Sequence, residues 1–186
     1  MKLQKQLFPD HNPDEGKFGD CYRTCIAILL DMDAADVPHF ARLESTHEWS
    51  REKTNEVVRE WLAERGYSML SFVIHATFVG IDKWVTEATG GVPYILTSQS
   101  NKYKDVCHCT IATGAFEPVW CPQAGRAVKQ EPWYDEEVDA HFFGIEMLVR
   151  GPGSVLCSVP PEGWYCTRPA GHDGPCAAHP NKDYNQ

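Results

Sequence analysis

The chain has 186 residues, of which 42% are hydrophobic and 23% are charged, and its formal net charge is -9. This composition is typical of a globular protein with one domain, or one domain and a small appendage. The negative charge argues against a nucleic-acid surface, and no run of 18 apolar residues is present to span a membrane. The first residues lack the apolar core of a signal peptide, so a cytoplasmic location is expected.

The first half of the chain is predicted to be mainly helical. After an irregular stretch over 1–18, Asp20 is expected to cap a helix over 21–30. Apolar spacing, capping residues and closing glycines indicate three further helices, over 34–37, 50–66 and 80–89. A strand is expected over 68–75.

The second half is predicted to be β, followed by a segment of different character. β-branched and aromatic residues indicate strands over 92–99, 105–114, 115–121 and 141–150. Helices followed by a mainly antiparallel sheet are typical of the α+β class. The remainder, 151–186, is rich in Gly and Pro and cannot bury enough apolar surface to fold alone. We therefore expect a domain over 1–150 and a separate tail over 151–186.

Cys21 opens the first predicted helix, where a thiol is easily activated. A helix N-terminus lowers the pKa of a cysteine and favours the nucleophilic thiolate, although the neighbouring Asp20 carboxylate opposes a second negative charge. Cys25 lies one turn further along the same face and is expected to be a small core residue.

A thiol nucleophile needs a base, and His108 is the best candidate. It lies on the predicted strand 105–114, far from Cys21 in sequence, as is usual for a Cys–His pair. Strand alternation is expected to direct it to the face opposite Cys107 and Cys109. His75 is the rival, but its apolar neighbours favour a core histidine. His39 and His47 are expected at the surface.

Three short motifs in order resemble papain-like cysteine peptidases and hydrolases. "GDCYRTCIAILLDMDAADVPHF" resembles their nucleophile helix, "GGVPYILTSQSNKYKDVCHCTIATGAFEPVWCP" their histidine hairpin, and "FFGIEMLVR" their closing strand. The resemblance is to small members that are common in phage genomes and to double-glycine peptidases that process bacteriocins. It implies a papain-like fold over about 19–150, Cys21 as nucleophile, His108 as base, and, for a phage protein, the host cytoplasm as location.

The sequence departs from this family pattern at two positions. Cys121 stands where the family has the aspartate that orients the imidazole and stabilises its cation. No glutamine lies a few residues before Cys21 to stabilise an oxyanion, and the nearest candidates are Gln4 and Gln6. The backbone N–H groups at Cys21 could form part of an oxyanion hole.

The tail carries a second candidate site. Cys157, Cys166, His172 and Cys176 have the spacing C-x8-C-x5-H-x3-C, which suits a structural Cys3His zinc ion, and His179 is an alternative ligand. Metal binding would supply the folding free energy that the segment lacks. Two other interpretations stay open. The tail cysteines are incidental or oxidised, or a shared metal site recruits one of the central cysteines, namely Cys107, Cys109 or Cys121.

Three classes of function follow from these residues. The first is a thiol hydrolase or acyltransferase that acts on an amide, peptide or isopeptide bond of a protein or peptide substrate. The second is a catalytically inactive papain-like scaffold that acts as a zinc-stabilised binding protein. The third is a zinc-stabilised structural protein, which requires the metal to involve Cys109 or Cys121.

Overall fold

The computed structural model describes residues 1–103, 106–150, 164–166 and 178–180, the last two ranges through their backbone alone. The described helices all lie before Gly90, with one strand, β1 (Tyr67–His75), between the last two of them, and the other strands follow. The helices are η1 (Pro13–Glu15), α1 (Cys21–Leu30), η2 (Ala34–Asp36), α2 (Phe40–Thr46), α3 (Arg51–Ala63) and α4 (Ile81–Thr89). Together with an antiparallel sheet, these helices confirm the predicted α+β class.

Six strands form one sheet in which the last long strand is inserted between earlier ones. The strands are β1 (Tyr67–His75), β2 (Tyr94–Gln99), β3 (Cys107–Thr113), β4 (Glu117–Trp120), β5 (Trp133–Asp135) and β6 (Ala140–Arg150). Their order is β1-β6-β2-β3-β4, and β5 pairs with β6. β2 is antiparallel to both β3 and β6, so β3, which carries His108, lies inside the sheet between β2 and β4.

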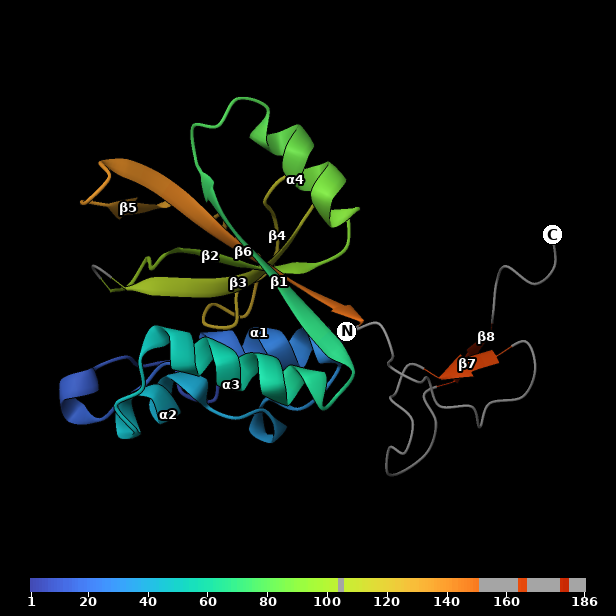
Figure 1. Cartoon of the computed structure of the whole chain (residues 1–186), viewed down its shortest axis with the longest axis horizontal. Helices are drawn as coiled ribbons and strands as arrows, with labels where there is room; N and C mark the ends of the chain where they lie inside the picture. The colour runs from blue at the N-terminus through green and yellow to red at the C-terminus, as the bar shows by residue number, and fades with distance from the viewer. Residues whose placement is uncertain (104–105, 151–163, 167–177, 181–186) are drawn as a thin grey trace. The chain divides into compact units, whose positions relative to one another are not determined.

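Helices pack on both faces of this sheet (Figure 1). α1 lies against β3 and β2, and Cys25, Ile26, Ala27 and Ile28 in its middle are all fully buried. α4 packs on the other side, where Val85 joins a cluster of buried residues from the strands: Ile74, Tyr94, Leu96, Ala112, Ile145 and Met147. Burial of each large aliphatic side chain contributes about 2 kcal/mol, so these two layers hold α1 and α4 against the sheet.

Most observed elements match predicted ones, but η1, α2 and the short strands β5, β7 (Trp164–Cys166) and β8 (Ala178–Pro180) are not among the predicted elements. α1 has both ends where its apolar run predicted them, and a hydrogen bond from Ala35 N–H to the Asp33 carboxylate (3.2 Å) caps η2 as expected. The sequence did not predict β5. Three residues are too few to display a strand period, and β5 forms only because β6 offers it a partner.

The chain divides into two compact units. The first contains Met1–Thr54 and Leu70–Leu148, and it holds every candidate catalytic residue. The second contains the described residues of Asn55–Met69 and Val149–Gln186. In the second unit the Arg65 guanidinium stacks on the Trp61 ring (3.8 Å to the centroid), and β7 (Trp164–Cys166) pairs with β8 (Ala178–Pro180).

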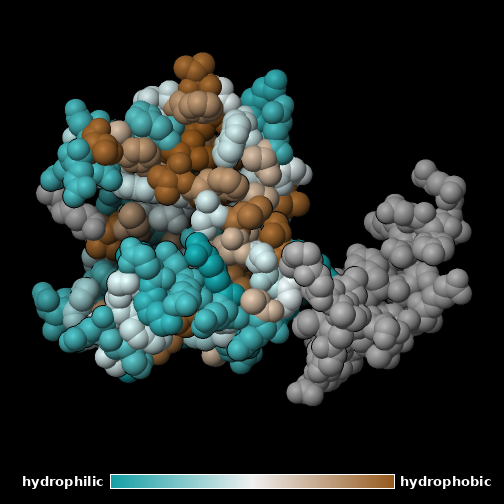
Figure 2. Space-filling model, viewed as in Figure 1, coloured by the Kyte–Doolittle hydropathy of each residue, from teal (hydrophilic) through white to brown (hydrophobic). Residues whose placement is uncertain are grey.

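The first unit exposes several large apolar side chains. Figure 2 shows hydrophobic surface over the region of β1 and α4, where Leu70, Val73, Phe78, Val79 and Trp84 are exposed.

With 13 residues, α3 is the longest of the described helices, and no described helix combines the length and apolar character that a membrane crossing requires.

Candidate active site

The N-terminus of α1 is held in place by a buried carboxylate rather than by a side-chain cap. Asp20 occupies the N-cap position, as predicted, but its side chain makes no capping hydrogen bond to the helix. Its carboxylate instead accepts from the backbone N–H groups of Leu7 (3.3 Å) and Phe8 (2.9 Å) and pairs with Arg23 (3.1 Å). Asp20 is 1% exposed. The negative charge that was expected to oppose the Cys21 thiolate is therefore neutralised by Arg23.

The same N-terminal segment connects the start of α1 to the end of β4. Gln6 N–H donates to the Pro122 carbonyl (3.1 Å), and the Trp120 indole N–H donates to the Gln4 carbonyl (2.8 Å). Since Leu7 and Phe8 bind Asp20, residues 4–8 join the element that carries Cys21 to the one that carries Cys121. An irregular segment thus aligns two elements that the sheet alone does not connect.

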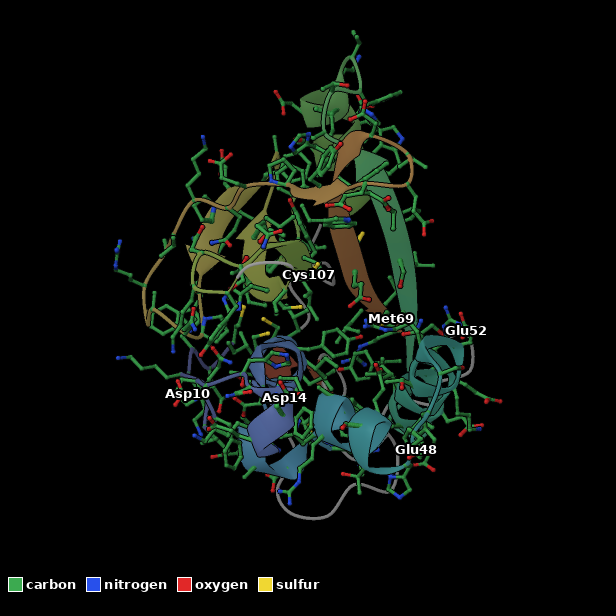
Figure 3. All side chains as sticks on the ribbon, turned by 90° about the vertical axis from the view of Figure 1, so that its left-hand side faces the viewer. Asp10, Asp14, Glu48, Glu52, Met69 and Cys107 are labelled. Atoms are coloured by element: carbon green, nitrogen blue, oxygen red, sulfur yellow. The ribbon has the colours of Figure 1, made fainter. Side chains whose placement is uncertain are left out.

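Cys21 is partly exposed, and its sulfur interacts with two consecutive residues of β3. Its side chain has hydrogen-bond partners in the Cys109 thiol, the His108 imidazole and the Cys109 backbone N–H. Strand alternation predicts that His108 and Cys109 point to opposite faces of the sheet. In the structure, however, both side chains interact with Cys21. Figure 3 shows sulfur atoms gathered below Cys107, between β3 and the helices.

His108 is buried and contacts two sulfurs. Its Nε2 lies 3.3 Å from the Cys121 sulfur, and its side chain also interacts with that of Cys21. The strand around it is supported from β2, where the buried Ser98 hydroxyl donates to Gln130 Oε1 (2.9 Å) and contacts the His108 carbonyl (3.4 Å). The structure therefore brings together Cys21, His108 and Cys121, the three residues that the sequence singled out.

The charges of this cluster favour a thiolate beside an imidazolium. Hydrogen bonds from Cys109 and His108 hold the pKa of Cys21 well below that of a free thiol, despite its desolvation. Burial lowers the pKa of His108, but contacts with Cys121 and Cys21 outweigh this effect and raise it to about 9. The pKa of Cys109 is raised by its hydrogen bond to Cys21 and by burial, so it stays a neutral S–H donor.

The other sequence candidates lie elsewhere. The prediction of a core position for His75 is wrong, because the side chain is exposed, with Nδ1 bound to Thr77 (2.8 Å to the hydroxyl) and the ring edge against Phe142. His39 was expected at the surface but is half-buried, and its Nε2 contacts the Phe18 carbonyl (3.0 Å). His47 is exposed and Cys25 is fully buried, as predicted.

The two candidate oxyanion glutamines differ in their surroundings. The Gln4 amide is fully engaged, since it donates to the Met32 carbonyl (2.8 Å) and accepts from Ala34 N–H (3.0 Å). The Gln6 amide instead lies beside Gly19, two residues before the nucleophile: its Nε2 would be 3.8 Å from a Cβ at Gly19. Among the described residues, one weak contact, 3.4 Å to the Phe8 carbonyl, engages that nitrogen.

The predicted zinc ligands Cys157, His172 and Cys176 lie outside the described residues, and only the backbone of Cys166 is described. That backbone pairs with Ala178 in the β7–β8 hairpin, next to the pair of Tyr165 with His179. Within 1–103 and 106–150, no three His, Cys, Asp or Glu side chains are arranged to hold a metal ion.

Sequence reasoning missed one residue of the site, Cys109. Its role as hydrogen-bond donor to Cys21 depends on where α1 lies along β3, which no local pattern reports. The only available signal was its place in the triplet Cys107–His108–Cys109.

Comparison of the chain with protein-family models, with curated proteins and with solved structures found no match.

Proposed function

We propose that this protein is a thiol hydrolase or acyltransferase with a papain-like scaffold, in which Cys21 is the nucleophile and His108 the general base and acid. The observation that supports this most is the contact between the two side chains, which come from a helix N-terminus and a sheet strand. The partial exposure of Cys21 supports it too, since a substrate must reach the sulfur, whereas Cys25, Cys109 and Cys121 are buried.

The proposed reaction begins with the thiolate–imidazolium pair. The Cys21 sulfur attacks the acyl carbon of an amide, peptide or isopeptide bond, and His108 gives its proton to the departing amine. A thioester on Cys21 results. Water, or an acceptor amine in the case of acyl transfer, then attacks the thioester while His108 takes its proton, and Cys21 leaves as thiolate.

Two groups are suited to stabilise the oxyanion of this reaction. One is the backbone N–H of Cys21, at the N-terminus of α1. The other is the Gln6 side chain, which lies beside Gly19 although it is fifteen positions before Cys21 in sequence. Gln4 is excluded from this role by its hydrogen bonds to Met32 and Ala34.

Acylation and turnover with p-nitrophenyl acetate test the proposal. The protein should release about one nitrophenolate per chain in a burst, carry acetyl on Cys21 by mass spectrometry, and continue to release product at steady state. Cys21→Ala should lose both phases. His108→Ala should slow acylation by roughly 100-fold or more. Cys25→Ala, which removes a fully buried thiol one turn further along the same helix, is the matched control and should behave as the parent.

The same experiment separates the enzyme from an inactive scaffold. If Cys21 is acetylated but the burst is followed by no further release, the site holds a reactive thiol without the means to complete turnover. That result would favour the zinc-stabilised binding protein. If Cys21→Ala is acetylated like the parent, the nucleophile assignment is wrong.

A further inference from the structure

The imidazole of His108 has a second sulfur that the proposed reaction does not use. Cys121 Sγ lies 3.3 Å from Nε2, within the range of a hydrogen bond to sulfur. Cys121 is 4% exposed, so a substrate that reaches Cys21 does not reach this sulfur. Two thiols therefore share one imidazole, and only one of them is open to solvent.

The chain around Cys121 is folded into a tight turn whose N–H groups face the sulfur. Cys121 N–H donates to the Arg126 carbonyl (2.9 Å), and Gly125 N–H donates back to the Cys121 carbonyl (2.8 Å). Gly125 adopts a φ of +68°, which favours glycine and closes the turn. The Ala124 N–H points at Sγ from 3.4 Å. Backbone N–H groups arranged in this way stabilise an anion.

The surrounding charges are compatible with a thiolate at this position. Burial raises the pKa of Cys121, but His108 and the N–H groups of Ala124 and Gln123 more than offset this and lower it below its usual range. The ionisable groups around the site include Cys25 and Cys21 on α1, Cys109 on β3 and Glu146 on β6, and the Lys5 side chain lies beside Gly125 in the turn.

We propose that Cys121 is a positioning residue whose thiolate accepts the Nε2–H of His108 and so holds the imidazole with Nδ1 directed to Cys21. This inference rests on the proposed function and assigns the task of the missing carboxylate to a buried sulfur. The proton on Nε2 stays between His108 and Cys121 throughout. The proton that moves to the leaving amine is the one on Nδ1. Cys121 itself forms no bond to the substrate.

The test measures how fast iodoacetamide alkylates Cys21 between pH 5 and 10, with peptide mapping to identify the modified residue. It compares the parent with Cys121→Ala, Cys121→Ser and Cys121→Asp. The parent should show an apparent pKa for Cys21 well below 9. Loss of the anion in Cys121→Ala and Cys121→Ser should make the imidazolium less stable and slow alkylation at pH 6.5 at least tenfold. Cys121→Asp restores a negative charge and should keep the parent's profile.

The outcomes distinguish this inference from the proposed function. A parent whose Cys21 alkylates with the free-thiol pKa of about 8.5 overturns both. A parent with an acidic Cys21 whose profile is unchanged in Cys121→Ser overturns the inference alone. Cys121→Ser keeps the size of the side chain, so it remains informative if Cys121→Ala does not fold. Urea unfolding of each variant checks that the profiles belong to folded protein.

Discussion

The two described cysteines that solvent reaches most, Cys21 and Cys107, have opposite pKa shifts. Cys107 is exposed at the start of β3, and partial burial of its thiol, together with the charge of Cys21, raises its pKa despite Arg51 nearby. The pKa of Cys21 is lowered by Cys109 and His108. Exposure alone would make Cys107 the more reactive thiol, whereas thiolate content favours Cys21.

This contrast predicts the order of labelling. At pH 7, iodoacetamide should modify Cys21 at least tenfold faster than Cys107, because only Cys21 is largely ionised there. The ratio should fall above pH 9, where Cys107 ionises in turn. Peptide mapping after short exposures measures both sites in one sample. Faster labelling of Cys107 at pH 7 would show that accessibility, not charge, governs these thiols.

At the scale of elements, α1 depends on Asp20 in a way that the sequence did not indicate. A carboxylate before a helix predicts a side-chain cap, but here the helix starts without one. Asp20 instead binds the N–H groups of residues 7–8, and the Arg23 guanidinium that neutralises it also lies over the Phe8 ring (5.6 Å). One buried ion pair therefore fixes both the nucleophile helix and the segment before it.

Replacing this carboxylate should be costly. Asp20→Asn leaves the buried Arg23 cation without its partner, and loss of one member of a buried pair destabilises by about 3 kcal/mol. Urea unfolding measures the change. Glu87→Gln removes the exposed i,i+4 pair with Lys83 and is the matched control, for which no measurable change is expected. Equal unfolding midpoints for the two variants would contradict the structural importance of Asp20.

At the scale of the whole molecule, the order β1-β6-β2-β3-β4 decides which elements meet around His108. Because β6 pairs with β2 on one side, the other side of β2 is left for β3, and α1 lies against both β2 and β3. β4 then returns along β3, and the turn after it brings Cys121 to the imidazole. The site is thus assembled from a helix, a strand and a turn.

The tail gives a separate prediction at this scale. The spacing of Cys157, Cys166, His172 and Cys176 predicts one tightly held zinc ion per chain. Metal analysis of the purified protein should find it, and Cys176→Ser should lose most of it, whereas Cys121→Ser should retain it. If Cys121→Ser lost its zinc while Cys176→Ser kept it, the metal would be bound by the central cysteines. That result would contradict both the tail site and the proposed role of His108.

The amino-acid order alone was enough to predict the extent of α1, most strands of the sheet, and Cys21 and His108 as candidate catalytic residues. These features follow from local periodicity, from glycine and capping signals, and from the chemistry of single side chains, all of which a linear sequence displays. Folding in three dimensions is what brings Cys121 to His108, Cys109 to Cys21 and Asp20 to Arg23, and it places Gln6 rather than Gln4 beside Gly19. Such contacts depend on the order of the strands and on the path of an irregular segment. Neither of these leaves a repeating pattern in the sequence.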